Sequence, residues 1–475
     1  MGRLLFIQDN GVNENLGVMS IAGMLRARGH EADLILTDEH PKNYLDLIAG
    51  YKPDLIAFSF MTGNREWAFA TARALKEKFA TPIIMGGVHP TLFPEDIDLS
   101  TVDYICIGEG EYPVLELMNA IGNGEDGSQI KNLWCRKNGD VIKNPLRDLI
   151  QDFDPLPLPY REIYYKYRFI RDLPIKRFIS GIGCPYRCTF CHNPLQKKIY
   201  EGRGKFIRKK SVARVIREVR HVKDRYPLKN VHFSDDTFVM DKEWLAAFLS
   251  AYRREISLPF SCNIRIDQVN EEMIRDLADS GCYGISFGIE SGSDRIRNTI
   301  LKKNLKEEDI IANSKIIKRH GIKMIVTNLM GVPEETLDDA FKTVAINQKI
   351  GADYTRAGVL IPYPKTEIVD YAIERGLLPA DYAIHNFTQI IRKSLIRSRY
   401  AREFENLCAL FNLTVHFPFL TPLTRILIKL PFTRLYSLTR LWEAFENMLY
   451  FRLFNRAGFR YCFHIVKNVR RDVWR

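Results

Sequence analysis

Three cysteines stand close together near the middle of the chain. Cys184, Cys188 and Cys191 have the spacing C-x3-C-x2-C, and Phe190 directly precedes the third of them. Three thiolates so close together favour a soft metal or an iron–sulfur cluster. A structural zinc ion needs a fourth ligand, and His192 is available as one. The spacing therefore predicts a metal centre, with a 4Fe-4S cluster that keeps one iron open as the main hypothesis and zinc as the alternative.

The segment around the cysteines has the pattern of a parallel barrel. Residues 175–180 are predicted to form a strand, and the cysteines lie on the loop that leaves its C-terminal end. Strand and helix then alternate, with further strands expected at 231–233, 260–266, 285–289, 323–329 and 354–361. Six such units over residues 175–376 predict a partial (β/α)6 TIM-type barrel, in which functional groups gather at the C-terminal ends of the strands.

The N-terminal part, residues 1–122, also alternates strand and helix. Strands are expected at 4–8, 32–36, 55–60, 82–87 and 104–108. Five strands with four crossovers predict a flavodoxin-like, doubly wound α/β domain, whose ligands bind at the C-terminal ends of the strands. Glycine at these ends lets a bulky ligand approach the backbone. The candidate ligand contacts at this edge are Ser59, Gly86, Gly87, His89, Gly108 and Glu109.

Two further segments have a different composition. Residues 123–174 are a turn-rich and proline-spaced linker, with a hairpin expected over 134–142 around Asn138-Gly139. Residues 377–475 lose the alternation and predict a mainly helical C-terminal extension. The net charge is +12, and residues 391–475 hold +11 of it. Basic residues among Trp, Phe and Leu suit a helix that lies in a membrane surface. The alternative is a helical extension that covers the barrel. Binding of nucleic acid is disfavoured.

The cysteines also indicate the compartment. The chain has nine cysteines without a regular disulfide framework, and thiolate clusters belong in a reducing environment. We therefore expect a cytoplasmic protein, and the basic C-terminal extension suggests association with the inner face of the membrane. No uninterrupted apolar stretch of about 18 residues is present, so no membrane span is expected.

The cysteine motif, with its preceding aromatic residue, resembles that of the radical S-adenosylmethionine (radical SAM) superfamily. The stretches Phe-Ser-Asp-Asp-Thr-Phe, Gly-Ile-Glu-Ser-Gly-Ser and Met-Gly-Val-Pro-Glu-Glu are similar to the superfamily's S-adenosylmethionine-binding stretches. Where that family usually has Gly-Gly-Glu, this chain has Ser234-Asp235-Asp236. The carboxylates suit an ammonium or hydroxyl groups, and the alternative is that each caps a helix. The contacts implied by this resemblance are Phe190, Asp235, Asp236, Glu290, Ser291, Gly331 and Val332.

The N-terminal domain, with Gly-Gly-Val-His-Pro-Thr and Gly-Glu-Gly-Glu at its strand ends, resembles the cobalamin-binding domain of cobalamin-dependent radical SAM enzymes. The resemblance implies that the six residues named at this edge contact cobalamin. Many such domains carry D-x-H-x-x-G after the first strand, where the histidine binds cobalt. Residues 9–14 of this chain contain no histidine. His89 is therefore expected to be structural or close to the nucleotide tail, and not an axial ligand.

The resemblance also implies an activity. An electron donor such as flavodoxin or ferredoxin would reduce the cluster, and cleavage of S-adenosylmethionine would give a radical that takes hydrogen from carbon. We expect methylation of an unactivated carbon in a small-molecule or lipid-like substrate, and the sequence identifies no catalytic residue. The alternative is a cobalamin-assisted radical cyclase or oxidoreductase without methyl transfer. A tRNA methylthiotransferase is disfavoured because residues 1–122 contain only one cysteine, Cys106, and a non-enzymatic sensor is a further alternative.

Overall fold

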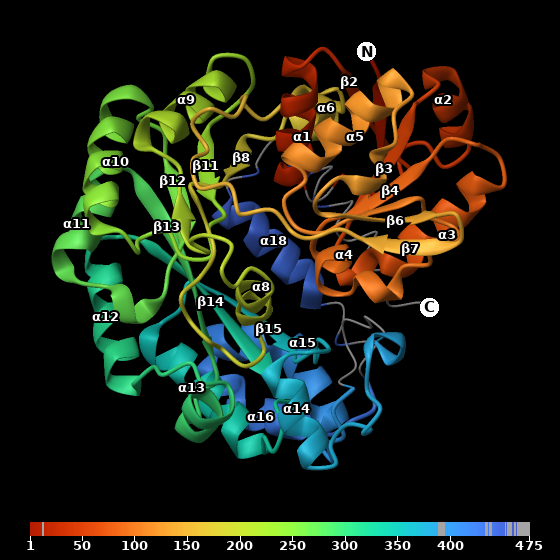
Figure 1. The fold of residues 1–475 in the computed structure, drawn as a ribbon. Coiled ribbons are helices and arrows are strands. Elements are labelled where there is room, and N and C mark those ends of the chain that lie inside the picture. The colour runs from red at the N-terminus through yellow and green to blue at the C-terminus, as the bar shows by residue number, and fades with distance from the viewer. Residues whose placement is uncertain are drawn as a thin grey trace. The chain divides into compact units, whose positions relative to one another are not determined.

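The computed structural model describes residues 1–11, 14–387, 395–432, 436, 439–451, 453, 458–459 and 462. The chain forms two compact units (Figure 1). The first contains Met1–Arg171 and Gln196–Phe206, and the second contains Asp172–Leu195 and Ile207–Arg475. The expected linker thus belongs to the first unit, and the chain returns briefly to that unit after the cysteines.

The first unit is built on a seven-stranded sheet with the order β2-β1-β3-β4-β5-β6-β7. Its parallel strands are β1 (Arg3–Gln8), β2 (Glu31–Leu36), β3 (Leu55–Ser59), β4 (Ile83–Gly86) and β5 (Tyr104–Cys106). These parallel strands have the flavodoxin order, as expected. After β2, successive strands are added on the opposite side of β1, so the order of addition reverses between β1 and β3. Apolar runs in the strands are buried on both faces because helices cover both faces of such a sheet.

The helices of this unit are α1 (Leu16–Ala27), α2 (Tyr44–Tyr51), α3 (Arg65–Lys76), α4 (Val88–Leu92) and α5 (Glu111–Asn123). Asn15 caps α1, because its side-chain oxygen accepts from the N–H groups of Gly17 and Val18. The helices carry the chain back from the C-terminal edge of each parallel strand to the opposite edge, so that the loops at the C-terminal edge are available for ligands.

The expected hairpin extends the sheet. Strands β6 (Leu133–Lys137) and β7 (Asp140–Lys143) are antiparallel, and β6 pairs with β5. Asn138 and Gly139 both have positive φ, at 53° and 92°, as a two-residue type I′ turn requires. After it, the short helices α6 (Glu162–Tyr165) and α7 (Arg168–Arg171) follow the proline-spaced segment. Pairing with β5 explains why this segment joins the first unit.

The second unit holds a six-stranded, all-parallel sheet with the order β15-β14-β13-β12-β11-β8. Its strands are β8 (Ile175–Phe178), β11 (Asn230–Phe233), β12 (Phe260–Asn263), β13 (Cys282–Glu290), β14 (Lys323–Met330) and β15 (Tyr354–Val359). The helices between them are α9 (Val212–Lys223), α10 (Lys242–Glu255), α11 (Glu271–Asp279), α12 (Glu307–Arg319) and α13 (Leu337–Ile350). With α14 (Glu367–Glu374) after β15, these six strand–helix repeats form the partial barrel that the alternation predicted.

The two faces of this sheet differ in composition. Phe233 on β11 faces outward, where its ring lies 5.3 Å from that of Phe248 on α10. On β11 to β13 and just after β11, the residues that alternate with such outward positions are small or polar: His232, Ser234, Ser261, Asn263, Gly284, Ser286 and Gly288. A TIM barrel normally fills its interior with branched apolar side chains. The inner face of these three strands therefore carries smaller side chains than a TIM barrel normally does, and the Tyr450 ring takes the space over Gly284.

The C-terminal extension contains α15 (Ala401–His416), α16 (Thr421–Leu427) and α18 (Arg440–Tyr450) in its described part. Helix α15 packs against β15 and α13. Helix α18 lies on the inner side of the strands, away from α9–α12 (Figure 1). Both helices cover the barrel, which was the structural alternative. No helix in the described part of the chain is long and apolar enough to cross a membrane.

Candidate functional site

The cysteine loop lies between β9 (Gly181–Ile182) and α8 (Asn193–Ile199). Thr189 anchors it: its N–H donates to the Leu301 carbonyl at 3.1 Å and its hydroxyl donates to the Ile300 carbonyl at 2.8 Å. The Thr189 carbonyl accepts from the N–H of Ile368 at 3.0 Å. Segments that are distant in sequence thus fix the loop at the C-terminal end of β8.

The three thiols are free, half-buried and close enough to influence one another. Burial raises the pKa of the Cys184 thiol, and it raises the pKa of Cys191 to about 11; the nearby Cys188 thiol contributes to both shifts. In the described residues, no three His, Cys, Asp or Glu side chains are placed to hold one metal ion. A cubane cluster binds each cysteine to a different iron, so its ligands need not converge on one point. Three soft donors on one anchored loop fit such a cluster.

Asp235 and Asp236 follow β11 and face different surroundings. Asp235 is buried, and its carboxylate accepts from the Ser180 N–H at 3.0 Å and the Ser180 hydroxyl at 2.6 Å. Lys209 Nζ lies 3.7 Å from the same carboxylate. Asp236 is exposed, and its charge raises the pKa values of Cys184 and Cys191. Asp236 is therefore the carboxylate near the cysteine loop, and Asp235 fixes the end of β8. Neither caps α10, whose cap is Asp241.

Glu290 ends β13 in a buried ion pair. Its Oε1 lies 2.8 Å from Nζ of Lys303. Glu290 has a φ of 66°, which costs a residue other than glycine about 1–3 kcal/mol and is found mostly at functional sites. The next residue, Ser291, is buried, and its carbonyl accepts from Arg297 at 2.9 Å. Arg297 also donates to the Leu305 carbonyl at 2.8 Å, which fixes the loop that carries Lys303.

The apolar S-adenosylmethionine contacts that were predicted lie together. Phe190 is half-buried against the hydrophobic cluster that contains Val332. Gly331 has a φ of 70°, and the N–H of Val332 donates to Glu335 at 3.0 Å. Burial raises the pKa of Glu335 to about 8. The Glu335 carboxyl group thus holds the turn after β14 next to Phe190.

Arg265 was not among the site residues predicted from the sequence. Its Nη1 lies 3.9 Å from the Sγ of Cys188, and its guanidinium lies 3.6 Å from the centre of the Tyr186 ring. Its Nη2 donates to the Lys303 carbonyl at 2.7 Å. The only available signal was its position near the C-terminal end of the predicted strand 260–266, where polar residues of a barrel tend to be functional. Arg265 links the cysteine loop to the segment that holds Glu290.

At the ligand edge of the first unit, the strand ends are tied together. The Ser59 hydroxyl accepts from the Asn15 side chain at 2.9 Å. The Thr91 hydroxyl donates to the Gly87 carbonyl at 2.7 Å and accepts from the N–H of Gly108 at 2.9 Å. Gly87 has a φ of 98°, and a Cβ there would lie 2.9 Å from the backbone of Phe60. Gly87 thus leaves room for the Phe60 backbone, and the contact of Ser59, Gly86 and Gly87 with cobalamin stays a prediction.

Gly108 and Glu109 have partners within the unit. A Cβ on Gly108 would lie only 1.5 Å from the hydroxyl of Tyr200, so this glycine makes room for a side chain of the same unit. Glu109 accepts from the N–H of Ile150 at 2.8 Å and so anchors the proline-spaced segment. Packing explains both residues, and their contact with cobalamin stays a prediction.

His89 was expected among the cobalamin contacts, as a structural residue or one close to the nucleotide tail, and the structure places it in the core. Its ring is 0% exposed and is stacked 5.4 Å from the ring of Phe60. Its Nε2 lies 3.2 Å from Asp96 and its Nδ1 lies 3.4 Å from the Thr62 hydroxyl. A ligand would reach this ring only if the core repacked. We therefore assign His89 to the core of the first unit.

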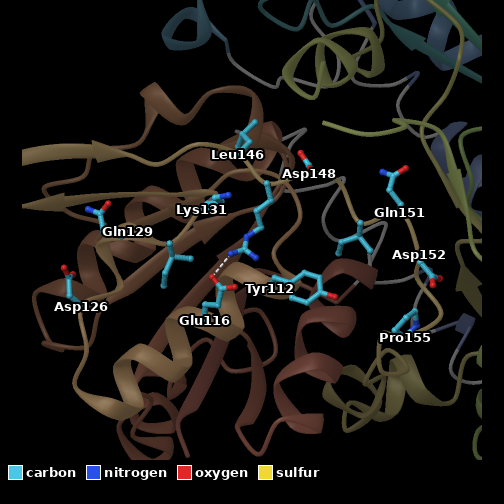
Figure 2. Close-up of a pocket in the computed structure, with 13 residues that line it drawn as sticks. Tyr112, Glu116, Asp126, Gln129, Lys131, Leu146, Asp148, Gln151, Asp152 and Pro155 are labelled. Atoms are coloured by element: carbon cyan, nitrogen blue, oxygen red, sulfur yellow. Dashed lines mark hydrogen bonds and ion pairs between the residues drawn. The ribbon is translucent and has the colours of Figure 1, made fainter. Parts of the chain in front are cut away.

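One pocket of the first unit is lined by residues of α5 and of the segment 126–155 (Figure 2). It has a volume of about 840 Å³. Figure 2 shows Tyr112 and Glu116 of α5 on one side and Gln151 and Asp152 on the other, with an ion pair between Glu116 and Arg147 at 2.6 Å. None of the six predicted cobalamin contacts lines it. Ile150 lines the pocket and donates its N–H to Glu109, so the pocket borders one of these predicted contacts.

The chain matches two family models. The model of the radical SAM superfamily matches residues 178–345, and that of the B12 binding domain matches residues 2–118. The first match includes the cysteine loop and the strands β11 to β14. The second covers the five parallel strands of the first unit.

Relatives and solved structures show the same arrangement. The chain is 29% identical over 371 residues to an uncharacterized methyltransferase of Pyrococcus horikoshii, and the match covers 76% of this chain and 79% of the relative. Its fold is similar to that of TsrM from Kitasatospora setae, a radical S-adenosylmethionine methyltransferase solved with tryptophan and an S-adenosylmethionine analogue (TM-score 0.66, 18% identity, 79% and 76% of the two chains). It is also similar to OxsB, a cobalamin-dependent S-adenosylmethionine radical enzyme (TM-score 0.69, 15% identity, 94% and 73% covered).

Proposed function

We propose that the chain is a cobalamin-dependent radical SAM enzyme that methylates an unactivated carbon of a small-molecule or lipid-like substrate. The observation that carries the proposal is the presence of a B12-binding domain and a radical SAM core in one chain. The relative named as an uncharacterized methyltransferase matches about three quarters of this chain, which supports methyl transfer. An electron donor such as flavodoxin or ferredoxin would complete the system.

When bound, the cluster with S-adenosylmethionine supplies a carbon radical that removes hydrogen, and cobalamin supplies the methyl group. The chain's own residues bind and orient these groups. Cys184, Cys188 and Cys191 hold the cluster. Asp236 is available to an ammonium beside it, and Phe190 with Val332 forms an apolar wall suited to adenine.

The Glu290–Lys303 pair has a positioning role in this proposal. Lys303 holds one carboxylate oxygen of Glu290, so the other oxygen keeps a fixed direction at the end of β13. A fixed carboxylate can accept from both hydroxyl groups of a ribose. Arg265 contributes a positive charge close to Cys188 and connects the two halves of the site.

Product analysis under strict anaerobiosis tests the proposal. The full chain is reconstituted with its cluster and given cobalamin, S-adenosylmethionine and a reductant, and both 5′-deoxyadenosine and S-adenosylhomocysteine are quantified. We expect both products, with S-adenosylhomocysteine formed only when cobalamin is present. The Cys188→Ala variant is expected to form no 5′-deoxyadenosine.

The second candidate function is a radical cyclase or oxidoreductase without methyl transfer. Formation of 5′-deoxyadenosine with no S-adenosylhomocysteine at any cobalamin concentration would replace the first proposal with this one. If the fully reconstituted protein cleaves no S-adenosylmethionine, both enzymatic proposals fail and the sensor alternative gains support.

We also propose a peripheral membrane contact through the C-terminal extension. Large apolar side chains are exposed along residues 417–432: Phe417, Phe419, Leu423, Ile426 and Phe432. Lys429 is exposed beside them, and residues 391–475 carry most of the net charge. Exposed apolar side chains with basic residues beside them suit binding to the surface of an anionic membrane.

Flotation with phosphatidylglycerol vesicles tests this contact. The full chain is expected to float, and a Phe419→Ser/Ile426→Ser variant is expected to lose most of this binding. Val141→Ser is the matched control, because Val141 is an exposed apolar residue of the first unit. Equal flotation of the double variant and the wild type would remove the membrane proposal and leave the enzymatic one.

A further inference from the structure

The cysteine loop has an outer side whose residues take no part in holding the cluster. Pro185 and Arg187 are exposed. They alternate along the loop with three half-buried residues: Cys184, Tyr186 and Cys188. The Tyr186 ring packs inward against the guanidinium of Arg265. Pro185 and Arg187 therefore lie on the opposite, solvent side of the loop, next to Ile182, which is 38% exposed.

Helix α8 continues from this loop and carries two lysines. It begins at Asn193, whose N–H donates to the sulfur of Cys191. Lys197 and Lys198 are exposed on the same helix. A helix rises about 1.5 Å per residue, so Lys198 is roughly 8 Å along the axis from Asn193. Both ammonium groups are thus carried by an element whose first residue contacts a predicted cluster ligand.

The solvent side of this segment is positively charged. Among the described residues, the side chains of Arg187, Lys197 and Lys198 form no ion pair and no hydrogen bond. One carboxylate, Asp236, acts on two of the cysteines. Residues 184–205 contain five Lys or Arg and one Glu, a balance of +4. Three cations without partners outnumber the nearby carboxylate, so this side attracts an acidic partner.

We propose that Ile182, Pro185, Arg187, Lys197 and Lys198 form the docking surface for an acidic protein that reduces the cluster. This inference rests on the proposed function, which needs an electron at the cluster. One electron passes from the reduced donor protein to the cluster, so the donor is oxidised by one electron. No bond is formed or broken in this step, and no proton is moved.

The composition of the surface suits a transient redox partner. Electron-transfer complexes bury little surface, below about 1,200 Å², and charge complementarity steers their association. Ile182 and Pro185 supply a small apolar centre, and the three cations supply the charged surroundings. A donor that docks here approaches the cysteine loop from the side opposite Arg265. The inner side of the loop then stays available to S-adenosylmethionine.

Stopped-flow mixing of the reconstituted full chain with flavodoxin hydroquinone, an acidic donor, tests the inference. The readout is the second-order rate constant for oxidation of the flavodoxin. We expect Lys197→Glu/Lys198→Glu to lower it at least about tenfold at about 0.01 M KCl, where the screening length is about 30 Å. The difference is expected to nearly vanish at about 1 M KCl, where that length is about 3 Å. Dithionite is expected to reduce the clusters of both proteins to the same extent.

Lys315→Glu/Lys318→Glu is the matched control. Both lysines are exposed on α12, and the C-terminal end of that helix leads into the start of β14, at the sheet edge opposite the cysteine loop. This variant changes the net charge by the same amount and is expected to keep a rate constant close to that of the wild type. Carbodiimide cross-linking is expected to join flavodoxin carboxylates to Lys197 or Lys198, and not to Lys315 or Lys318.

Equal rate constants for the wild type and Lys197→Glu/Lys198→Glu at low KCl would overturn the inference, as would cross-links confined to other lysines. Equal rate constants together with lost vesicle flotation in this variant would assign the two lysines to the membrane contact instead. Cross-linking requires no turnover, so it separates this inference from the proposed function. Cross-links at Lys197 or Lys198 without cleavage of S-adenosylmethionine by any reductant would remove the proposed function alone. Cleavage with dithionite, but no cross-link at these lysines, would remove the docking surface alone.

Discussion

The Nζ atom of Lys303 lies 2.8 Å from Oε1 of Glu290, and both side chains are buried at the C-terminal end of β13. Gly288 provides the space for this pair, because a Cβ there would lie 1.9 Å from the same oxygen. The ion pair and the left-handed backbone of Glu290 are thus maintained together. This arrangement fixes one carboxylate where the radical SAM core is expected to hold a ribose.

Loss of Lys303 is expected to destabilise the protein. Lys303→Met leaves the buried Glu290 carboxylate without its partner, which typically costs about 3–5 kcal/mol in the free energy of unfolding. Urea denaturation measures this change. Lys302→Met is the matched control, since Lys302 forms an exposed ion pair with Glu367, and it is expected to cost less than about 1 kcal/mol. Glu290→Gln added to Lys303→Met is expected to restore part of the stability. A Lys303→Met variant as stable as the wild type would contradict the assignment.

The cluster assignment predicts different behaviour for two half-buried cysteines. Cys188→Ala is expected to lower the iron and sulfide content after reconstitution and to abolish formation of 5′-deoxyadenosine, because the cluster loses one of its three protein ligands. Cys408→Ala, on α15, is expected to keep both. Iron and sulfide analysis with the visible absorption spectrum gives the readout. Full iron loading of Cys188→Ala would contradict the assignment of this ligand.

Arg265 is expected to tune the cluster. Its guanidinium is close to the Cys188 sulfur, and removing a positive charge there makes addition of an electron less favourable. Arg265→Gln is therefore expected to shift the midpoint potential of the cluster to a more negative value, and Arg265→Lys to restore most of it. A redox titration monitored by electron paramagnetic resonance measures the potential. Arg275→Gln, on the exposed face of α11, serves as the control. An unchanged potential in Arg265→Gln would rule out this electrostatic role.

Glu335 is expected to make stability depend on pH. Burial raises its pKa from 4.5 to about 8, so the folded state binds the proton more tightly than the unfolded state does. Between these two values the folded protein holds more protons, and stability is expected to fall as the pH rises. The free energy of unfolding of Glu335→Gln should decline less over this range, by up to about 1.4 kcal/mol per pH unit. Glu334→Gln, its exposed neighbour, is the control. Identical slopes for Glu335→Gln and the wild type would contradict the raised pKa.

The sequence predicted the features that depend on local pattern. Alternating strands and helices indicated both sheets, and Asn138-Gly139 indicated the hairpin because both residues tolerate a positive φ. The position of the cysteines after a strand indicated the functional edge of the barrel. These features follow from short-range spacing, which a single sequence contains.

Spacing could not separate residues whose roles depend on distant partners. Asp235 and Asp236 are adjacent, yet Ser180 and Lys209 bind only the first of them and leave the second near the cysteines. The pattern Gly-Gly-Val-His-Pro-Thr likewise placed His89 at a ligand edge, whereas Phe60 and Asp96 enclose it in the core. The contact of Tyr450 with Gly284 joins positions that lie far apart in the chain, and no local pattern indicates it.

The return of residues 196–206 to the first unit has a consequence for synthesis of the protein. Domains generally fold from the N-terminus as the chain emerges. Two contacts of the first unit, however, come from residues that follow the cysteine loop. Tyr200 packs against Gly108, and the Arg203 carbonyl accepts from the N–H of Leu149. Both residues are translated only after the cysteine loop. The ribosome has therefore already produced all three cluster ligands when the N-terminal unit completes its fold. A gene truncated after residue 171 would produce that unit with the space next to Gly108 unfilled.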